Sequence, residues 1–173
     1  MNPKRICLCA LALSLVIAAT CNATKAQTEE VIDNLIPKHL PIKVELVFEK
    51  GSPKVLETVK FRVTNTGTRP IYFLGFFLEP AKDPELDKPY VVSWIRFGRT
   101  ELLTFGKLAN SEDLPLQPGE NVVVEPKGVE LFRAGINASL QTMPRKYELI
   151  FQQLNFGDGT GFWGSTGAPF PEK

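Results

Sequence analysis

Few residues in this sequence have the types and spacing that catalysis needs. His39 is the only histidine of the chain, and no Gly-x-Ser-x-Gly sequence is present to hold a serine nucleophile on a sharp turn. A lone histidine without such a partner is typical of packing or solvent exposure rather than of acid–base catalysis. The sequence therefore predicts that the protein is not an enzyme and needs no cofactor.

Four acidic residues fall close together between 79 and 89, where they alternate with lysines and prolines. Carboxylates in one loop could bind a calcium ion, which needs six to eight oxygen ligands, or could serve as the acids of a hydrolase. Lys82 and Lys88 favour a solvated surface loop of mixed charge instead, so both of these uses are kept only as alternatives. The four residues are Glu79, Asp83, Glu85 and Asp87.

Aromatic residues near the C-terminus follow a stretch, 155–161, in which three of seven residues are glycine. Such a turn could fold the rings back onto the core. Alternatively the rings could form an exposed patch for a protein or glycan partner. We expect Phe156 to be shielded and leave both interpretations open for Trp163. The possible binding surface predicted from the sequence consists of Phe162, Trp163 and Phe170.

The first 26 residues have the layout of a signal peptide. Lys4 and Arg5 precede an uncharged apolar run from 6 to 19, and small side chains at Thr24 and Ala26 suit cleavage after Ala26. Cleavage after Ala23 suits the sequence nearly as well. The run is too short to cross a bilayer of roughly 30 Å as a helix, and no later segment is long and apolar enough. We therefore expect a periplasmic or secreted protein without a transmembrane span.

Cysteine usage offers one alternative to simple cleavage. All three cysteines lie within residues 1–26, so cleavage after Ala26 leaves no thiol, disulfide or cysteine metal ligand. The run 18–21, Ala-Ala-Thr-Cys, resembles a bacterial lipobox, in which the cysteine carries a lipid anchor. Because the first and third residues of this run depart from the preferred ones, a lipid anchor at Cys21 is the less favoured outcome.

The charge balance of the mature chain points to no particular partner. Removal of the signal peptide takes away three of the 20 basic residues and none of the 19 acidic ones, which leaves a net charge of −2. The basic residues form no stripe, so nucleic acid is not expected as a partner. The remaining 147 of 173 residues suit a single domain.

The elements that must position these residues are mainly strands. Apolar residues at helical spacing in the segment 27–41 predict a short helix or, failing that, a tether. From residue 42 to 173 the pattern predicts an all-β, immunoglobulin-like antiparallel β-sandwich of about seven strands with one or two short helices. Strands are predicted at 42–48, 59–64, 71–78, 90–97, 101–105, 122–124 and 146–156, with a loop at 79–89 and a helix at 129–140.

The alternation within these strands predicts which side chains are buried. Phe61 should face the core, while Lys60 and Arg62 point to solvent. Trp94 lies inside a predicted strand and is assigned to the core. Residues 65–68, Asn-Thr-Gly-Thr, should form a tight connection, because Asn and Gly accept positive φ at little cost.

Two stretches carry a family resemblance. Residues 61–67, Phe-Arg-Val-Thr-Asn-Thr-Gly, and residues 116–120, Leu-Gln-Pro-Gly-Glu before a valine-rich strand, resemble bacterial extracytoplasmic Ig-like modules of the cell-adhesion-related or proteinase-inhibitor-like type. The resemblance implies an Ig-like fold and a binding or structural role with an unknown protein or glycan partner. It implies no site residues, and a proteinase-inhibitor role stays open as an alternative.

Overall fold

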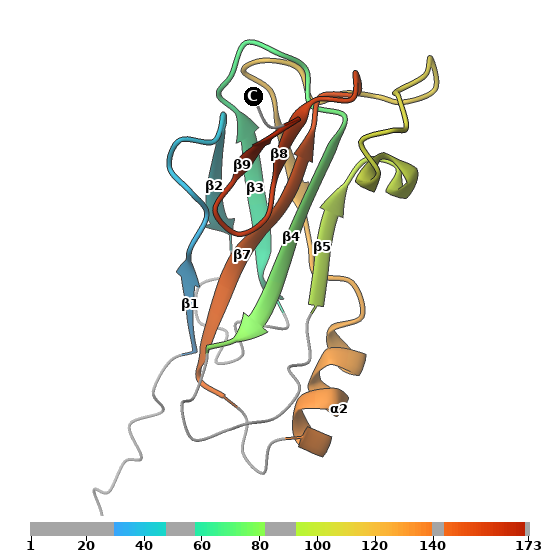
Figure 1. Cartoon of the computed structure of the whole chain (residues 1–173). Helices are drawn as coiled ribbons and strands as arrows, with labels where there is room; N and C mark the ends of the chain where they lie inside the picture. The colour runs from blue at the N-terminus through green and yellow to red at the C-terminus, as the bar shows by residue number, and fades with distance from the viewer. Residues whose placement is uncertain (1–29, 48–57, 82–92, 140–143, 172–173) are drawn as a thin grey trace, which may run out of the picture.

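The computed structural model describes residues 30–47, 58–81, 93–139 and 144–171. In these ranges the chain consists mainly of β-strands, with one α-helix and one short 3₁₀-helix, which confirms the all-β class. The strands form two sheets that share one hydrophobic core (Figure 1). The signal peptide, the three cysteines and most of the acidic loop lie outside the described residues, so the predictions made for them stay predictions.

The smaller sheet contains three antiparallel strands in the order β2-β3-β6. Its central strand shows the alternation expected from the sequence, because Phe61 and Val63 are fully buried while Lys60 and Arg62 are exposed. This register was predicted correctly. The strands are β2 (Ile42–Val47), β3 (Lys60–Asn65) and β6 (Asn121–Val124).

The larger sheet follows the order β5-β4-β7-β8-β9, and β1 also joins it. The long strand β7 pairs with β4 along one edge. Along its other edge it pairs first with β1, in parallel, and then with β8, as Figure 1 shows. The strands are β1 (Val31–Asn34), β4 (Phe73–Pro80), β5 (Ser93–Phe97), β7 (Lys146–Asn155), β8 (Gly161–Trp163) and β9 (Ala168–Phe170).

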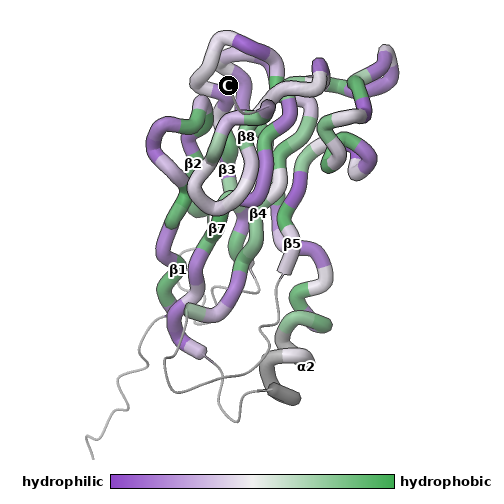
Figure 2. The backbone as a smooth tube through the Cα atoms, viewed as in Figure 1, coloured by the Kyte–Doolittle hydropathy of each residue, from purple (hydrophilic) through white to green (hydrophobic). Residues whose placement is uncertain are grey.

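The core lies between the two sheets. Side chains at alternate positions of each sheet point toward the other sheet and form one contiguous apolar cluster, while hydrophilic residues occupy many of the intervening positions (Figure 2). Because apolar burial is the main favourable term in folding, this cluster holds the two layers together. Its fully buried members include Phe61, Val63, Leu78, Ile95, Tyr147 and Leu149.

Residues 31–34 form a strand and not the helix or tether that the sequence suggested. They pair with residues 146–149 of β7, and an ion pair of 2.8 Å between Asp33 and Lys146 joins the two strands. Ile32 packs against the core while Val31 is half exposed. The distant β7 therefore overrides a local helical spacing, since it offers this segment a full set of backbone partners.

Residues 101–105 do not form the predicted strand. Thr100–Leu103 is instead a 3₁₀-helix, η1, whose Leu102 is fully buried. The Leu102 carbonyl accepts hydrogen bonds from the side-chain amides of Asn155 (2.8 Å) and Gln153 (3.4 Å) on β7. Tertiary contacts with β7 thus fix this segment as a turn.

The sequence predicted positive φ angles in the connection after β3. In the structure neither Asn65 nor Gly67 has a positive φ, so this part of the prediction is wrong. The chain leaves the smaller sheet here and enters the larger one. Asn65 is fully buried; its Oδ1 accepts from Gly67 N (3.0 Å), and its Nδ2 donates to the carbonyls of Arg69 (2.8 Å) and Leu116 (2.9 Å). The two stretches that carry the family resemblance are therefore hydrogen-bonded to each other.

The helix predicted near residue 129 is present as α2 (Val129–Ser139), which connects β6 to β7 at one end of the molecule (Figure 1). Phe132 is buried and its ring centroid lies 6.3 Å from that of Tyr147, so the helix is anchored to the core. Among the described residues, no helix is long and apolar enough to cross a membrane.

Candidate binding surface on the larger sheet

The larger sheet has one face turned away from the smaller sheet, and this outer face carries unusual side chains. Since neighbours along a strand point to opposite sides, the residues between the inward-facing ones must lie here. We call this the outer face and define it by Phe77 (β4), Trp94 (β5), Ile150 and Gln152 (β7) and Trp163 (β8). The register places Ile150, Phe77 and Trp94 directly side by side across three strands.

A β-bulge shapes the middle of the outer face. Gly75 pairs with Gln153 and Phe76 pairs with Phe151, so Gln152 is an extra residue without a partner on β4. Such a bulge re-aims the local side chains. The Gln152 carbonyl accepts a hydrogen bond of 2.8 Å from Gly164 N, and its side-chain Oε1 accepts one of 2.7 Å from the indole Nε1 of Trp94. The bulge thereby ties three strands together.

Gly75 makes room for the bond between Gln152 and Trp94. A Cβ at this position would lie 2.7 Å from Gln152 Oε1 and 3.4 Å from Trp94 Nε1. The first of these distances is shorter than real carbon atoms allow, so a side chain here would displace the amide. Close approach and not backbone conformation therefore favours glycine here, since a larger residue would have to push the flexible Gln152 side chain away from Trp94.

Beside this network lies a shallow hollow of about 290 Å³. Of the residues that line it, Trp163 has 47% of its surface exposed, and Phe77 and Ile150 are half-buried. No ionisable side chain lines it. The lining residues are Phe77, Ile150, Phe151, Gln152, Gln153, Trp163, Gly164 and Ser165.

The sequence assigned Trp94 to the core, but the structure places it half-buried on the outer face, outside the core cluster. Its ring is covered by Arg96, whose Cζ lies 4.8 Å from the ring centroid. The sequence did contain a signal for the outward orientation of Trp94. The alternation that buries Ser93 and Ile95 turns Trp94 outward.

The three aromatic residues predicted as one binding surface lie on both sides of the sheet, because the register puts Trp163 and Phe170 on one side and Phe162 on the other. Phe162 packs toward the core, with ring centroids 6.1 Å from Phe156 and 6.3 Å from His39. Trp163 points to the other side, because consecutive residues of a strand alternate. Phe170 is 37% exposed and stacks on Phe105, with ring centroids 4.1 Å apart. Only Trp163 lines the hollow.

The turn between β7 and β8 is held by polar contacts. Asp158 Oδ1 accepts hydrogen bonds from Thr160 N (3.1 Å) and Thr160 Oγ1 (2.7 Å), and Arg69 forms an ion pair of 2.6 Å with Asp158. The hydrogen bonds from Thr160 and the positive charge of Arg69 lower the pKa of Asp158. The Arg69 guanidinium also lies 3.9 Å from the ring centroid of Phe156. Phe156 itself is half-buried and packs against the core, so the expected shielding of its side chain is partial.

The described residues among the other candidates for catalysis or metal binding, His39 and Glu79, make contacts within the fold. His39 is exposed; its Nε2 donates to the carbonyl of Gly167 (3.0 Å) and its ring contacts Phe162. Glu79 extends β4 opposite Glu148, and Pro80 follows it in the strand, so the predicted loop begins later than expected. The remaining acidic residues of that loop, Asp83, Glu85 and Asp87, lie outside the described ranges.

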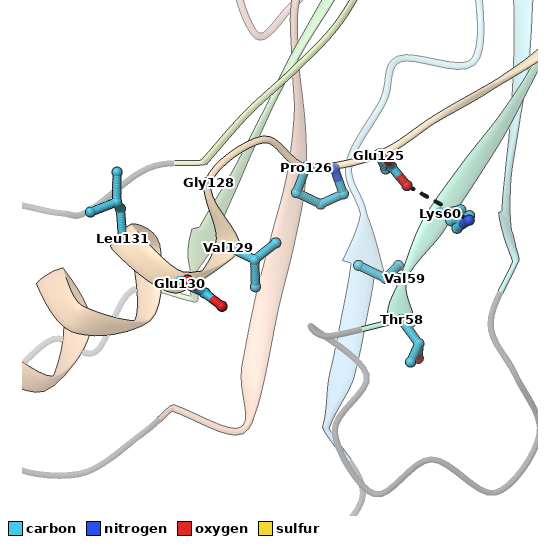
Figure 3. Close-up of a pocket in the computed structure, with 9 residues that line it drawn as sticks. All are labelled: Thr58, Val59, Lys60, Glu125, Pro126, Gly128, Val129, Glu130 and Leu131. Carbon is cyan, nitrogen blue, oxygen red and sulfur yellow. Dashed lines mark ion pairs between the residues drawn. The ribbon is translucent and has the colours of Figure 1, made fainter.

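A second hollow, of about 490 Å³, lies where β3 begins and α2 starts (Figure 3). Val59, Pro126 and Val129 form part of its wall, and Lys60 pairs with Glu125 across 3.7 Å at its rim. Its residues come from the start of β3, the segment after β6 and the first turn of α2. It lacks the aromatic and amide groups that meet on the outer face.

Among the described residues, no three His, Cys, Asp or Glu side chains gather as they would around a metal ion. The outer face is therefore the surface on which apolar rings and hydrogen-bonding groups come together in a defined geometry. No family model, curated protein or solved structure matches the chain, so its function has to be inferred from this geometry.

Proposed function

We propose that the protein is an exported, non-catalytic, Ig-like module that binds its partner through the outer face. The observation that carries the proposal is Trp163, which is 47% exposed beside an uncharged hollow. Large apolar groups gathered on a solvent-facing surface mark interaction sites, and tryptophan is enriched among residues that dominate binding energy. The bond between Gln152 and Trp94 gives this surface a fixed shape before any partner arrives.

The Ig-like part of the proposal is supported by the strand order. The strands β2-β3-β6 form one sheet and β5-β4-β7-β8 belong to the other, and two mainly antiparallel layers of this size are compatible with an Ig-like sandwich. A further supporting contact lies at the start of β7, where the Tyr147 hydroxyl donates to the carbonyl of Pro144 (3.0 Å). A tyrosine that bonds back to the preceding backbone at this corner is a recurring feature of such domains.

The experiment compares two single substitutions in the mature protein. Fluorescently labelled wild type, Trp163→Ala and Leu114→Ala are titrated onto envelope preparations from the organism that exports the protein. Leu114 is a matched control because it is 82% exposed, belongs to the loop before β6 and does not line the hollow. We expect saturable binding of the wild type and of Leu114→Ala, and binding of Trp163→Ala that is weaker by about tenfold or more.

Thermal denaturation completes this comparison. Because Trp163 is half exposed, its removal should leave the folded state nearly as stable as the wild type, with a change within about 1 kcal/mol. Equal envelope binding by wild type and Trp163→Ala would contradict the proposal, as would a wild type that shows no saturable binding.

One loop favours the proteinase-inhibitor alternative. The loop 104–116, between η1 and β6, exposes Leu108 and Leu114 (Figure 1), while Leu116 at its end is buried and pairs with Ile71. The loop is braced by Arg99, whose Nε and Nη2 donate to the two carboxylate oxygens of Asp113 at 2.7 and 2.8 Å. A rigid, projecting, apolar loop is what an inhibitor needs. Inhibition of a panel of serine proteinases that Leu114→Ala loses and Trp163→Ala retains would favour this function instead.

A further inference from the structure

We infer that the hollow on the outer face takes a neutral glycan, with one sugar ring against Trp163. The inference rests on the proposed function and adds the chemical class of the partner. A sugar ring presents carbon–hydrogen faces that suit aromatic and aliphatic surfaces, and hydroxyl groups that need hydrogen-bond donors and acceptors. The hollow offers both kinds of surface side by side.

The hydrogen-bonding capacity of Gln152 is set by its neighbour. An indole N–H can only donate, so the contact with Trp94 Nε1 fixes Oε1 on the Trp94 side of the amide. The Nε2 group then keeps two N–H donors, and no described residue accepts from them. The exposed hydroxyl of Ser165 lies in the same lining. Donors of this kind match the oxygens of a sugar.

The charges around the hollow favour a neutral ligand over an anionic one. The lining holds no ionisable side chain. Glu79 and Glu148 lie opposite each other on the outer face, two residues beyond Phe77 and Ile150. Arg96 lies over the Trp94 ring at 4.8 Å and donates to Thr100 Oγ1 at 2.5 Å. The outer face thus carries both signs of charge outside the hollow, while the hollow itself complements an uncharged partner.

The size of the hollow also favours a sugar. A volume of about 290 Å³ lies just below the range for small-ligand sites, roughly 300–1,000 Å³, so the hollow has room for about one sugar ring and not for a large ligand. Its lining includes Gly164 and Ser165 of the turn after Trp163. One ring of a longer glycan can occupy it while the rest of the chain runs over the open sheet.

The first test is affinity electrophoresis of the folded protein through gels that contain neutral glucan, mannan or galactan, or acidic alginate or polygalacturonate. We expect at least one neutral polysaccharide to retard the wild type and the acidic ones to have no effect. Trp163→Ala should abolish the retardation. Gln152→Glu keeps an oxygen for Trp94 Nε1 but replaces the Nε2 donors, so it should weaken binding by about tenfold. Leu114→Ala should behave as the wild type does.

The second test separates this inference from the proposed function. Envelope preparations are treated either with periodate, which cleaves the vicinal diols of sugars, or with a proteinase. Loss of Trp163-dependent binding after periodate alone supports the glycan. Binding that survives periodate and is lost after proteolysis overturns the glycan but leaves the binding module intact, because the partner is then a protein. Retardation by acidic polysaccharides alone would also overturn it.

Discussion

Phe61 and its two neighbours give the sharpest residue-scale test of the register. Phe61 is fully buried between the sheets, whereas Lys60 and Arg62 are exposed. Phe61→Ala should therefore lower the free energy of unfolding by about 3–5 kcal/mol, through lost burial and the cavity left behind. Lys60→Ala and Arg62→Ala should each change it by no more than about 0.5 kcal/mol. Urea denaturation of the three variants measures this, and equal losses at all three positions would contradict the register.

Asp113 should make stability depend on pH at the acid end. Its hydrogen bonds from Arg99 and from the backbone of Asn110 lower its pKa to about 2. A carboxylate whose pKa is depressed by folding stabilises the folded state above its ordinary pKa and loses that effect as pH falls toward its folded pKa. The stabilisation is thus complete near neutral pH and disappears between about pH 4 and pH 2.

The variant Asp113→Asn tests this contribution. Its Tm should lie below that of the wild type at pH 7, and the difference should shrink as pH is lowered from about 4 to about 2. Asp158→Asn is a useful comparison, because Asp158 also has a lowered pKa but is bonded to Thr160 and Arg69. A difference in Tm between wild type and Asp113→Asn that is constant over the whole range would contradict the assignment.

The candidate site was only partly predictable at this scale. Trp163 was identified from its glycine-rich surroundings, but Phe162 was grouped with it although adjacent residues of a strand face opposite ways. Gln152 was not identified. Its role depends on the bulge opposite Gly75 and on Trp94, which is 58 residues away in the sequence. Contacts at that separation leave no periodic trace in either segment.

At the scale of elements, the strands that bury one face were the most predictable. Alternation located β2, β3 and the first part of β7, and a run apolar on both faces located β4. The helix α2 was found because Val129 and Phe132 lie on one helical face. Residues 31–34 and 100–103 were assigned wrongly, since β7 decides both structures and β7 is far from each in the sequence. Local patterns cannot report such partners.

The 3₁₀-helix η1 can be tested as an element. Leu102 is fully buried against the larger sheet, while Thr104 at the end of the helix is exposed. Leu102→Ala should destabilise the protein by about 2–5 kcal/mol, and Thr104→Ala should have an effect within about 0.5 kcal/mol. Chemical denaturation provides the measurement. If 101–105 were a surface strand, Leu102→Ala would lower the free energy of unfolding no more than Thr104→Ala does. Equal effects of the two substitutions would therefore contradict the 3₁₀-helix.

At the scale of the whole molecule, the proposed export predicts which part of the chain forms the mature protein. Protein recovered from outside the cytoplasm should begin near Gln27 and contain no thiol, because all three cysteines precede that region. Intact mass and N-terminal sequencing measure this, with and without a thiol-alkylating reagent. A mature chain that begins at an acylated Cys21 would replace the proposal of a free exported domain by a lipid-anchored one.

The larger sheet also ends in a way that limits self-association. Its path stops at β9, and the central residue of that strand is Pro169, which pairs with Phe162 of β8. Proline has no N–H to offer, so a strand from a second molecule that tried to continue the ladder would find it interrupted there. An open sheet edge of this kind is otherwise a template for fibre growth, and we expect Pro169 to keep neighbouring copies from joining edge to edge there.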